Sequence, residues 1–116
     1  MMMQTRFQPG LSFKDNLQHL PAVDTVARIH LRDGKGAIVA SIENEAGKQG
    51  SLAVYHYVQQ QFGALDAAAA DYALSLFAEH VPDARNRPGA HPNIDRLFAI
   101  ADGGAPLTIE VVPVSG

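Results

Sequence analysis

The sequence predicts an α+β fold, a small antiparallel three-stranded sheet with helices packed on one face. Some segments alternate apolar and polar residues as strands do, others space their apolar residues three or four positions apart, and turn-forming residues lie between them. We expect strands at residues 25–32, 38–43 and 107–114, and packed helices at 51–62, 66–81 and 93–102. The 116 residues, of which 47% are hydrophobic, are enough for one domain with its own core.

Residues 1–12 are expected to be a loose lead-in to this single domain. Pro9 and Gly10 interrupt regular structure there. Ser12 has the side chain to cap a short helix that continues to Leu20, and Pro21 ends that helix.

The sheet is predicted to begin with a hairpin. Residues 25–32 alternate apolar side chains with Arg and His, which places one face on a core and the other in water. Residues 33–36, Asp-Gly-Lys-Gly, suit a tight reversal, so residues 38–43 return antiparallel. The third strand, 107–114, contains Pro113, which favours an edge position, and the direction of its pairing is left open.

Ser51 and Gly63 are the expected N-cap and terminator of the helix at 51–62. Asp66 is the expected N-cap of the helix at 66–81. The Pro- and Gly-rich residues 82–92 predict an irregular loop, after which Asn93 caps the last helix.

Composition excludes several classes of site. The chain has no cysteine, so disulfides, thiolate metal sites and a cysteine nucleophile are excluded. The N-terminal residues lack the pattern of a signal peptide, and no apolar run reaches the roughly 18–20 residues of a membrane span. We therefore expect a soluble, cytoplasmic protein that does not bind membranes. The net charge of −3 gives no overall attraction for nucleic acid.

Residues 43–57 are the most informative stretch, because a predicted strand, a Gly/Lys loop and a predicted helix follow one another there. Backbone N–H groups and the helix dipole favour an anion at such a helix start, and Lys48 adds a positive charge. The stretch is not a P-loop, because Ile42 and Gln49 stand where that motif needs a glycine and a Ser or Thr. The alternative to an anion site is that Gly and Lys in this loop serve only to turn the chain and to keep the surface soluble.

A second polar helix start, at residues 85–96, would complete a pocket if it met the first. It supplies two kinds of group, arginines that bind carboxylate or phosphate and a histidine that transfers protons near neutral pH. The predicted ligand-binding residues are Lys48, Gly50, Ser51, Arg85, Arg87, His91 and Arg96. The proton-transfer candidates are His80, His91 and His56. Alternatively, this segment is a solvated connector with surface ion pairs.

The other catalytic patterns are weak. Glu79, Asp83 and Asp95 with the histidines include metal-ligand types, but their spacing matches no metal motif, so we expect neither metal nor cofactor. Ser51 lacks the surrounding pattern of a nucleophile elbow, and helix capping explains it more simply.

His80 is open to two interpretations. The helical wheel of residues 66–81 places it beside Phe77 on the apolar side, which favours a buried histidine. Otherwise it lines a cleft next to the 82–92 loop, with His91 or Glu79 as its neighbour. We favour the buried position, because the wheel supports it and the sequence does not show a cleft.

The segments AGKQGSLAVYH, LFAEHVPDAR and HPNIDRL resemble a small bacterial domain family of unknown function. The resemblance covers the chain from the first helix to Ile100 and implies no activity or catalytic residue. The sequence thus predicts a domain that binds an anionic small molecule, phosphate or carboxylate, at a helix N-terminus. The alternative is a non-catalytic interaction or homodimerisation module that uses an exposed strand edge.

Overall fold

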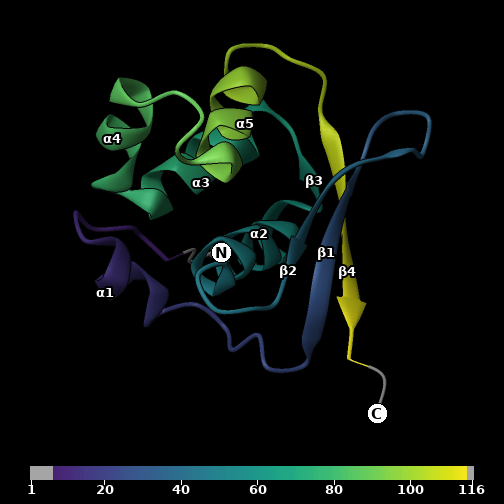
Figure 1. The fold of residues 1–116 in the computed structure, drawn as a ribbon, viewed down its shortest axis with the longest axis horizontal. Helices are drawn as coiled ribbons and strands as arrows, with labels where there is room; N and C mark the ends of the chain where they lie inside the picture. The colour runs from purple at the N-terminus through teal and green to yellow at the C-terminus, as the bar shows by residue number, and fades with distance from the viewer. Residues whose placement is uncertain (1–6, 115–116) are drawn as a thin grey trace, which may run out of the picture.

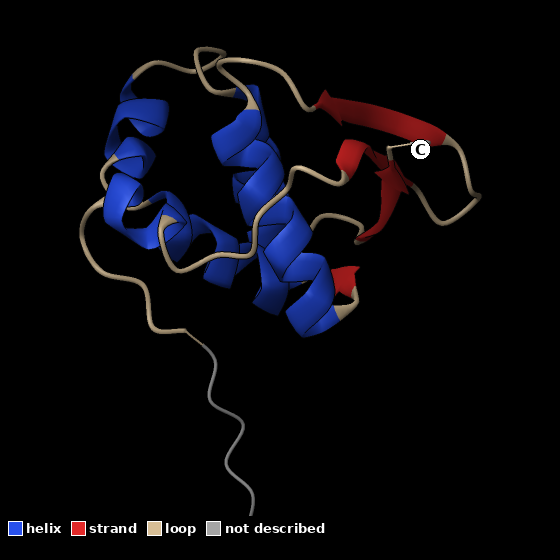
Figure 2. Cartoon of the chain, turned by 90° about the horizontal axis from the view of Figure 1, so that it is seen from below, coloured by secondary structure: helices blue, strands red, loops and turns tan. Residues whose placement is uncertain are grey.

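Residues 7–114, which the computed structural model describes, form a four-stranded antiparallel sheet with helices against one of its faces (Figure 1). The view in Figure 2 separates the two layers, with the helices on one side of the strands. In chain order the elements are α1 (Phe13–Leu17), β1 (Val26–Arg32), β2 (Ile38–Glu43), α2 (Gln49–Phe62), β3 (Ala64–Leu65), α3 (Ala67–Phe77), α4 (His80–Asn86), α5 (Pro92–Ala101) and β4 (Leu107–Pro113). The predicted α+β class is confirmed, but the predicted number of strands was one too few.

The β1–β2 hairpin is the part that the sequence predicts best. The strands pair antiparallel with Ile29 opposite Ile42, both in the core. The turn is closed by the Asp33 carboxylate, which accepts hydrogen bonds from the N–H groups of Lys35 and Ala37 at 2.9 and 3.0 Å. An aspartate that bonds the backbone two residues onward is typical of such turns.

The sheet order is β2-β1-β4-β3, so β4 pairs with β1 on one side and β3 on the other. The prediction from Pro113 that this strand lies at the edge of the sheet is therefore wrong. β3 pairs only with Leu107 and Thr108, whereas Pro113 lies opposite Val26 at the far end of β4. A proline is tolerated there because β3 does not reach it. β3 itself has two residues, too few to show an alternating pattern.

α2 begins at Gln49 with Lys48 as its N-cap, so the prediction of Ser51 as N-cap was wrong. The chain turns at Gly47, whose φ of 86° suits glycine, and the Leu52 N–H already donates to the Lys48 carbonyl oxygen at 3.0 Å. Ser51 is thereby left in the first turn of the helix with its hydroxyl free of a capping role. The predicted end at Gly63 is confirmed.

The predicted helix at 66–81 divides into two. Its start is confirmed, because the Asp66 side chain accepts a hydrogen bond from the Ala69 N–H at 2.9 Å. It ends at Phe77 because Ala78 has a φ of 52°, a conformation that an α-helix cannot contain. The chain then restarts as α4, so the predicted irregular loop at 82–92 was wrong for its first half.

α5 is capped two residues earlier than predicted. Its N-cap is His91, not Asn93, and Pro92 occupies the first helical position, where the N–H it lacks would have no partner in any case. The N–H groups of Ile94 and Asp95 both donate to the His91 carbonyl oxygen at 2.9 Å.

α1 is shorter than predicted, although its cap at Ser12 is confirmed. Of the predicted lead-in, residues 1–6 lie outside the described residues. Phe7 is attached to the helical layer, because its N–H donates to the Tyr57 hydroxyl at 3.2 Å and its ring stacks on His19.

The core lies between the sheet and the helices, where α2, α3 and α5 contribute most of the buried side chains. The opposite face of the sheet carries ion pairs, Arg28 with Glu43 and Arg32 with Glu110. Across residues 7–114, every helix is too short or too polar to cross a membrane.

Candidate functional site

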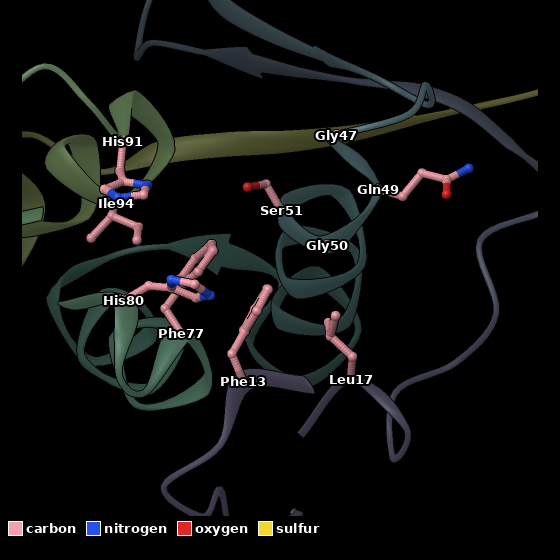
Figure 3. Close-up of a pocket in the computed structure, with 10 residues that line it drawn as sticks. All are labelled: Phe13, Leu17, Gly47, Gln49, Gly50, Ser51, Phe77, His80, His91 and Ile94. Atoms are coloured by element: carbon pink, nitrogen blue, oxygen red, sulfur yellow. The ribbon is translucent and has the colours of Figure 1, made fainter. Parts of the chain in front are cut away.

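A pocket of about 380 Å³ lies where α1, the start of α2, the α3–α4 turn and the start of α5 meet (Figure 3). Its apolar wall is formed by Phe13, Leu17, Phe77 and Ile94. Its polar wall is formed by Gly47, Gln49, Gly50, Ser51, His80 and His91. Both predicted polar helix starts contribute to it, the first through residues 47–51 and the second through His91.

Phe13 is the centre of the apolar wall. Its ring stacks on Phe77 with 5.2 Å between the ring centroids and meets the His80 ring edge-on at 4.9 Å. It also lies directly against α2, because a Cβ placed on Gly50 would be 2.9 Å from Phe13 Cζ. Gly50 is therefore required for this close approach, a reason different from the anion-binding amide that the sequence suggested.

α1 carries Phe13 and is fixed by a buried asparagine. The Asn16 side chain is 2% exposed, and its amide donates to the carbonyl oxygens of Leu76 at 3.1 Å and Gly10 at 3.2 Å. Its carbonyl oxygen accepts from the Gly10 N–H at 2.8 Å. All of the polar atoms of this side chain are thus bonded, as burial requires.

A second attachment joins α1 to the α3–α4 turn. The Phe13 N–H donates to Glu79 Oε1 at 2.7 Å, and this bond lowers the pKa of the Glu79 carboxyl group. Because the bond joins the first residue of α1 to the residue before His80, it holds one side of the pocket to the other.

The start of α2 has unpaired backbone donors on residues that line the pocket. The first turn of a helix leaves backbone N–H groups without intrahelical acceptors, and here these belong to Gln49, Gly50 and Ser51. The Ser51 side chain points toward the side of the pocket where His80 and His91 lie (Figure 3). Within residues 7–114 its hydroxyl makes no hydrogen bond.

His80 and His91 form the part of the polar wall that lies across the pocket from α2, with 6.0 Å between their ring centroids. His91 Nε2 lies 2.6 Å from Asp83 Oδ2, and Arg87 Nε donates to Asp83 Oδ1 at 2.9 Å. The hydrogen bond from Arg87 and, to a smaller extent, that from His91 hold the pKa of the Asp83 carboxyl far below its usual range. Asp83 is therefore a carboxylate, and it fixes His91 by hydrogen bonding.

His80 is half-buried and lines the pocket, so the buried position that we favoured is wrong. The helical wheel failed because α3 ends at Phe77, and His80 begins α4 with a different direction. Its neighbours are Phe13 and His91. No hydrogen bond from the described part of the chain reaches its ring nitrogens.

The predicted cationic ligands lie outside the pocket wall. Lys48 Nζ pairs with Glu45 at 3.1 Å, and the Arg85 guanidinium lies over the Phe98 ring at 4.2 Å. Arg87 is bound to Asp83, as described above. Arg96 donates to the Tyr55 hydroxyl at 3.1 Å and to Asn93 Oδ1 at 2.9 Å.

His56 is the third proton-transfer candidate, and it does not line the pocket. Its Nδ1 is buried without a hydrogen-bond partner in residues 7–114, and burial lowers the pKa of the ring. Among the described residues, no group of three or more His, Asp and Glu side chains is arranged to hold a metal ion.

Sequence reasoning missed the apolar wall and the role of Asp83. The wall joins residues from α1, α3 and α5, and no local pattern connects them. The sequence offered one signal for Asp83, its proximity to His91 in the same polar segment, but we considered it only as a metal ligand or a surface ion-pair partner.

A protein-family model described as "Uncharacterized protein conserved in bacteria (DUF2322)" matches residues 13–111. The chain belongs to this family. The resemblance to a small bacterial family of unknown function is thereby confirmed. Every residue that lines the pocket lies within the region that matches the DUF2322 model. Searches of curated proteins and of solved structures found no match to the chain.

Proposed function

We propose that the pocket binds a small organic molecule whose carboxylate or phosphate group lies at the start of α2. The observation that carries the proposal is that polar groups without partners in the described chain line one pocket together with an apolar wall. These groups are the Ser51 hydroxyl, the His80 ring nitrogens and the first amides of α2. A few fixed polar groups in a mainly apolar cavity are typical of ligand sites.

The start of α2 supplies the attraction for an anion. Its N–H groups and the helix dipole favour a negative group there. No Lys or Arg of residues 7–114 lines the pocket, so the amides and the Ser51 hydroxyl are the main contacts and Lys48 acts only through its field. We therefore expect affinities nearer millimolar than nanomolar for simple anions.

The apolar wall selects the rest of the ligand. Phe13 and Phe77 present aromatic rings beside the polar wall, so an aromatic or branched apolar body would be removed from water there. The volume of about 380 Å³ suits a small metabolite better than a peptide.

A thermal-shift screen with aromatic carboxylates and phosphorylated metabolites tests the proposal. Ser51→Asp should abolish the stabilisation by ligand, because it places a carboxylate where the anion binds. The substitution should not harm the fold, since an acidic residue in the first turn of a helix is favourable. Gln60→Glu adds the same charge on an exposed residue near the other end of α2 and is the matched control.

Two results would contradict the proposal. One is the absence of stabilisation by any compound in the screen. The other is equal stabilisation of the wild type and Ser51→Asp, which would place the binding elsewhere.

A second candidate function is self-association through the free edge of β2. This edge strand exposes the apolar side chains of Ile38 (48%) and Val39 (53%) beside its unpaired backbone groups, and such an edge can pair with a second chain. The molecular mass of the protein in solution, measured at increasing protein concentration, tests for self-association. Val39→Lys should abolish any dimer. A monomer at high concentration would reject it.

The lack of cysteine supports a cytoplasmic location for either function.

A further inference from the structure

We propose that the anion bound in this pocket also carries a hydroxyl group, as 2-hydroxy acids do, and that this hydroxyl donates a hydrogen bond to Nδ1 of His91. The inference rests on the proposed function and adds to it the chemical class of the ligand.

The Asp83 carboxylate sets which nitrogen of His91 is available. A carboxylate only accepts hydrogen bonds, so the contact of 2.6 Å requires that Nε2 of His91 carry the proton and donate. Arg87 favours the ionised form of Asp83 and so maintains this requirement. When His91 is neutral, its lone pair is therefore on Nδ1.

His91 Nδ1 makes no hydrogen bond within residues 7–114, and the His91 side chain lines the pocket at 28% exposure. A ligand that covers this nitrogen without offering a donor would leave it desolvated and unpaired, which is costly. A carboxylate or an ionised phosphate cannot supply that donor, whereas a hydroxyl can. The geometry therefore discriminates in favour of a hydroxylated anion.

His80 does not support the same argument. Neither of its ring nitrogens has a partner in the described chain, so nothing fixes which one carries the proton. It can donate or accept, whereas His91 is restricted to accepting at Nδ1 while it is neutral.

The probes are mandelate and phenylacetate, two aromatic carboxylates that differ by one hydroxyl. Binding is measured by calorimetry with the wild type, with His91→Phe, and with His30→Phe as a control on the outer face of the sheet. Mandelate should bind the wild type and the control about ten times more tightly than phenylacetate, a typical effect of one hydrogen bond. His91→Phe should remove that preference.

The ring nitrogens of His91 are measured independently by NMR of the unliganded wild type near neutral pH. A proton on Nε2 is expected, and a proton on Nδ1 would overturn the inference without any use of a ligand or variant. Equal affinity of the two acids would overturn the hydroxyl inference but leave the proposed function standing. Binding of neither acid would overturn the inference, whereas the proposed function is decided separately by the thermal-shift screen with Ser51→Asp.

Discussion

Replacing Gly50 with alanine tests whether Phe13 is packed against α2 as the structure shows. The new Cβ would lie 2.9 Å from Phe13 Cζ, 3.0 Å from Phe13 Cε2 and 3.5 Å from Leu17 Cδ1. The first two distances are too short for carbon atoms in contact, so the ring must move. Its retreat is restricted, because Phe77 stacks on it and His80 meets it edge-on.

The expected effect is a net loss of stability. Overpacking of this kind costs about 1–3 kcal/mol. The higher helix propensity of alanine than of glycine offsets no more than about 1 kcal/mol of this loss of stability. Subtracting this offset leaves a fall of about 1 kcal/mol, and at most about 2–3 kcal/mol, in the free energy of unfolding of Gly50→Ala, measured by urea denaturation. Gly34→Ala is the matched control, since a Cβ there meets nothing within 4 Å.

A double-mutant cycle separates the contact from a backbone effect. In a Phe13→Ala background the clash is absent, so Gly50→Ala should become neutral or slightly stabilising. A penalty that persists in that background, or a Gly50→Ala protein as stable as the wild type, would refute the assignment of Gly50 to this contact.

Three further predictions concern stability. Asn16→Ala should lower the free energy of unfolding by about 2–3 kcal/mol in urea titrations, because it removes the buried bond to the Leu76 carbonyl oxygen and the bonds to the Gly10 backbone; a loss under about 0.5 kcal/mol would contradict its anchoring role. Burial raises the pKa of Tyr55 from 10.0 to about 12, so the unfolded chain loses this proton first and stability should fall as pH rises from 10 towards 12. Tyr55→Phe should remove that part of the pH dependence, and an unchanged profile would contradict the assignment. Ala78→Gly should raise the melting temperature by relieving a φ of 52°, whereas Ala99→Gly, on the exposed face of α5, should lower it.

Local sequence patterns predicted the elements whose ends are marked by their own residues. The β1–β2 hairpin has Asp33 and two glycines at its turn, and α3 has Asp66 at its start, so the hairpin and the start of α3 were predicted correctly. The break after Phe77 was missed because Ala78 adopts a positive φ that usually belongs to glycine. The helical spacing therefore appeared to continue through His80.

The pocket was predictable only in part. Sequence reasoning identified residues 47–51 and His91 as polar groups at two helix starts, but whether they met depended on the packing of α5 beside α2. The apolar wall depends on α1, which Asn16 joins to the end of α3, and such a contact over 60 residues leaves no periodic signal. The charge of the arginines suggested ligand binding, but in the structure Arg87 is bonded to the Asp83 carboxylate and Arg85 lies over the Phe98 ring.

The central claim is that an anion binds at the start of α2 between Ser51 and His91. Its most direct test is an amide NMR titration of the wild type with mandelate, followed residue by residue. We expect the largest shift changes at Gly50 and Ser51, with further changes at His91 and Ile94. Changes centred on the β2 edge, or no saturable change at mandelate concentrations well above the expected millimolar affinity, would contradict the claim.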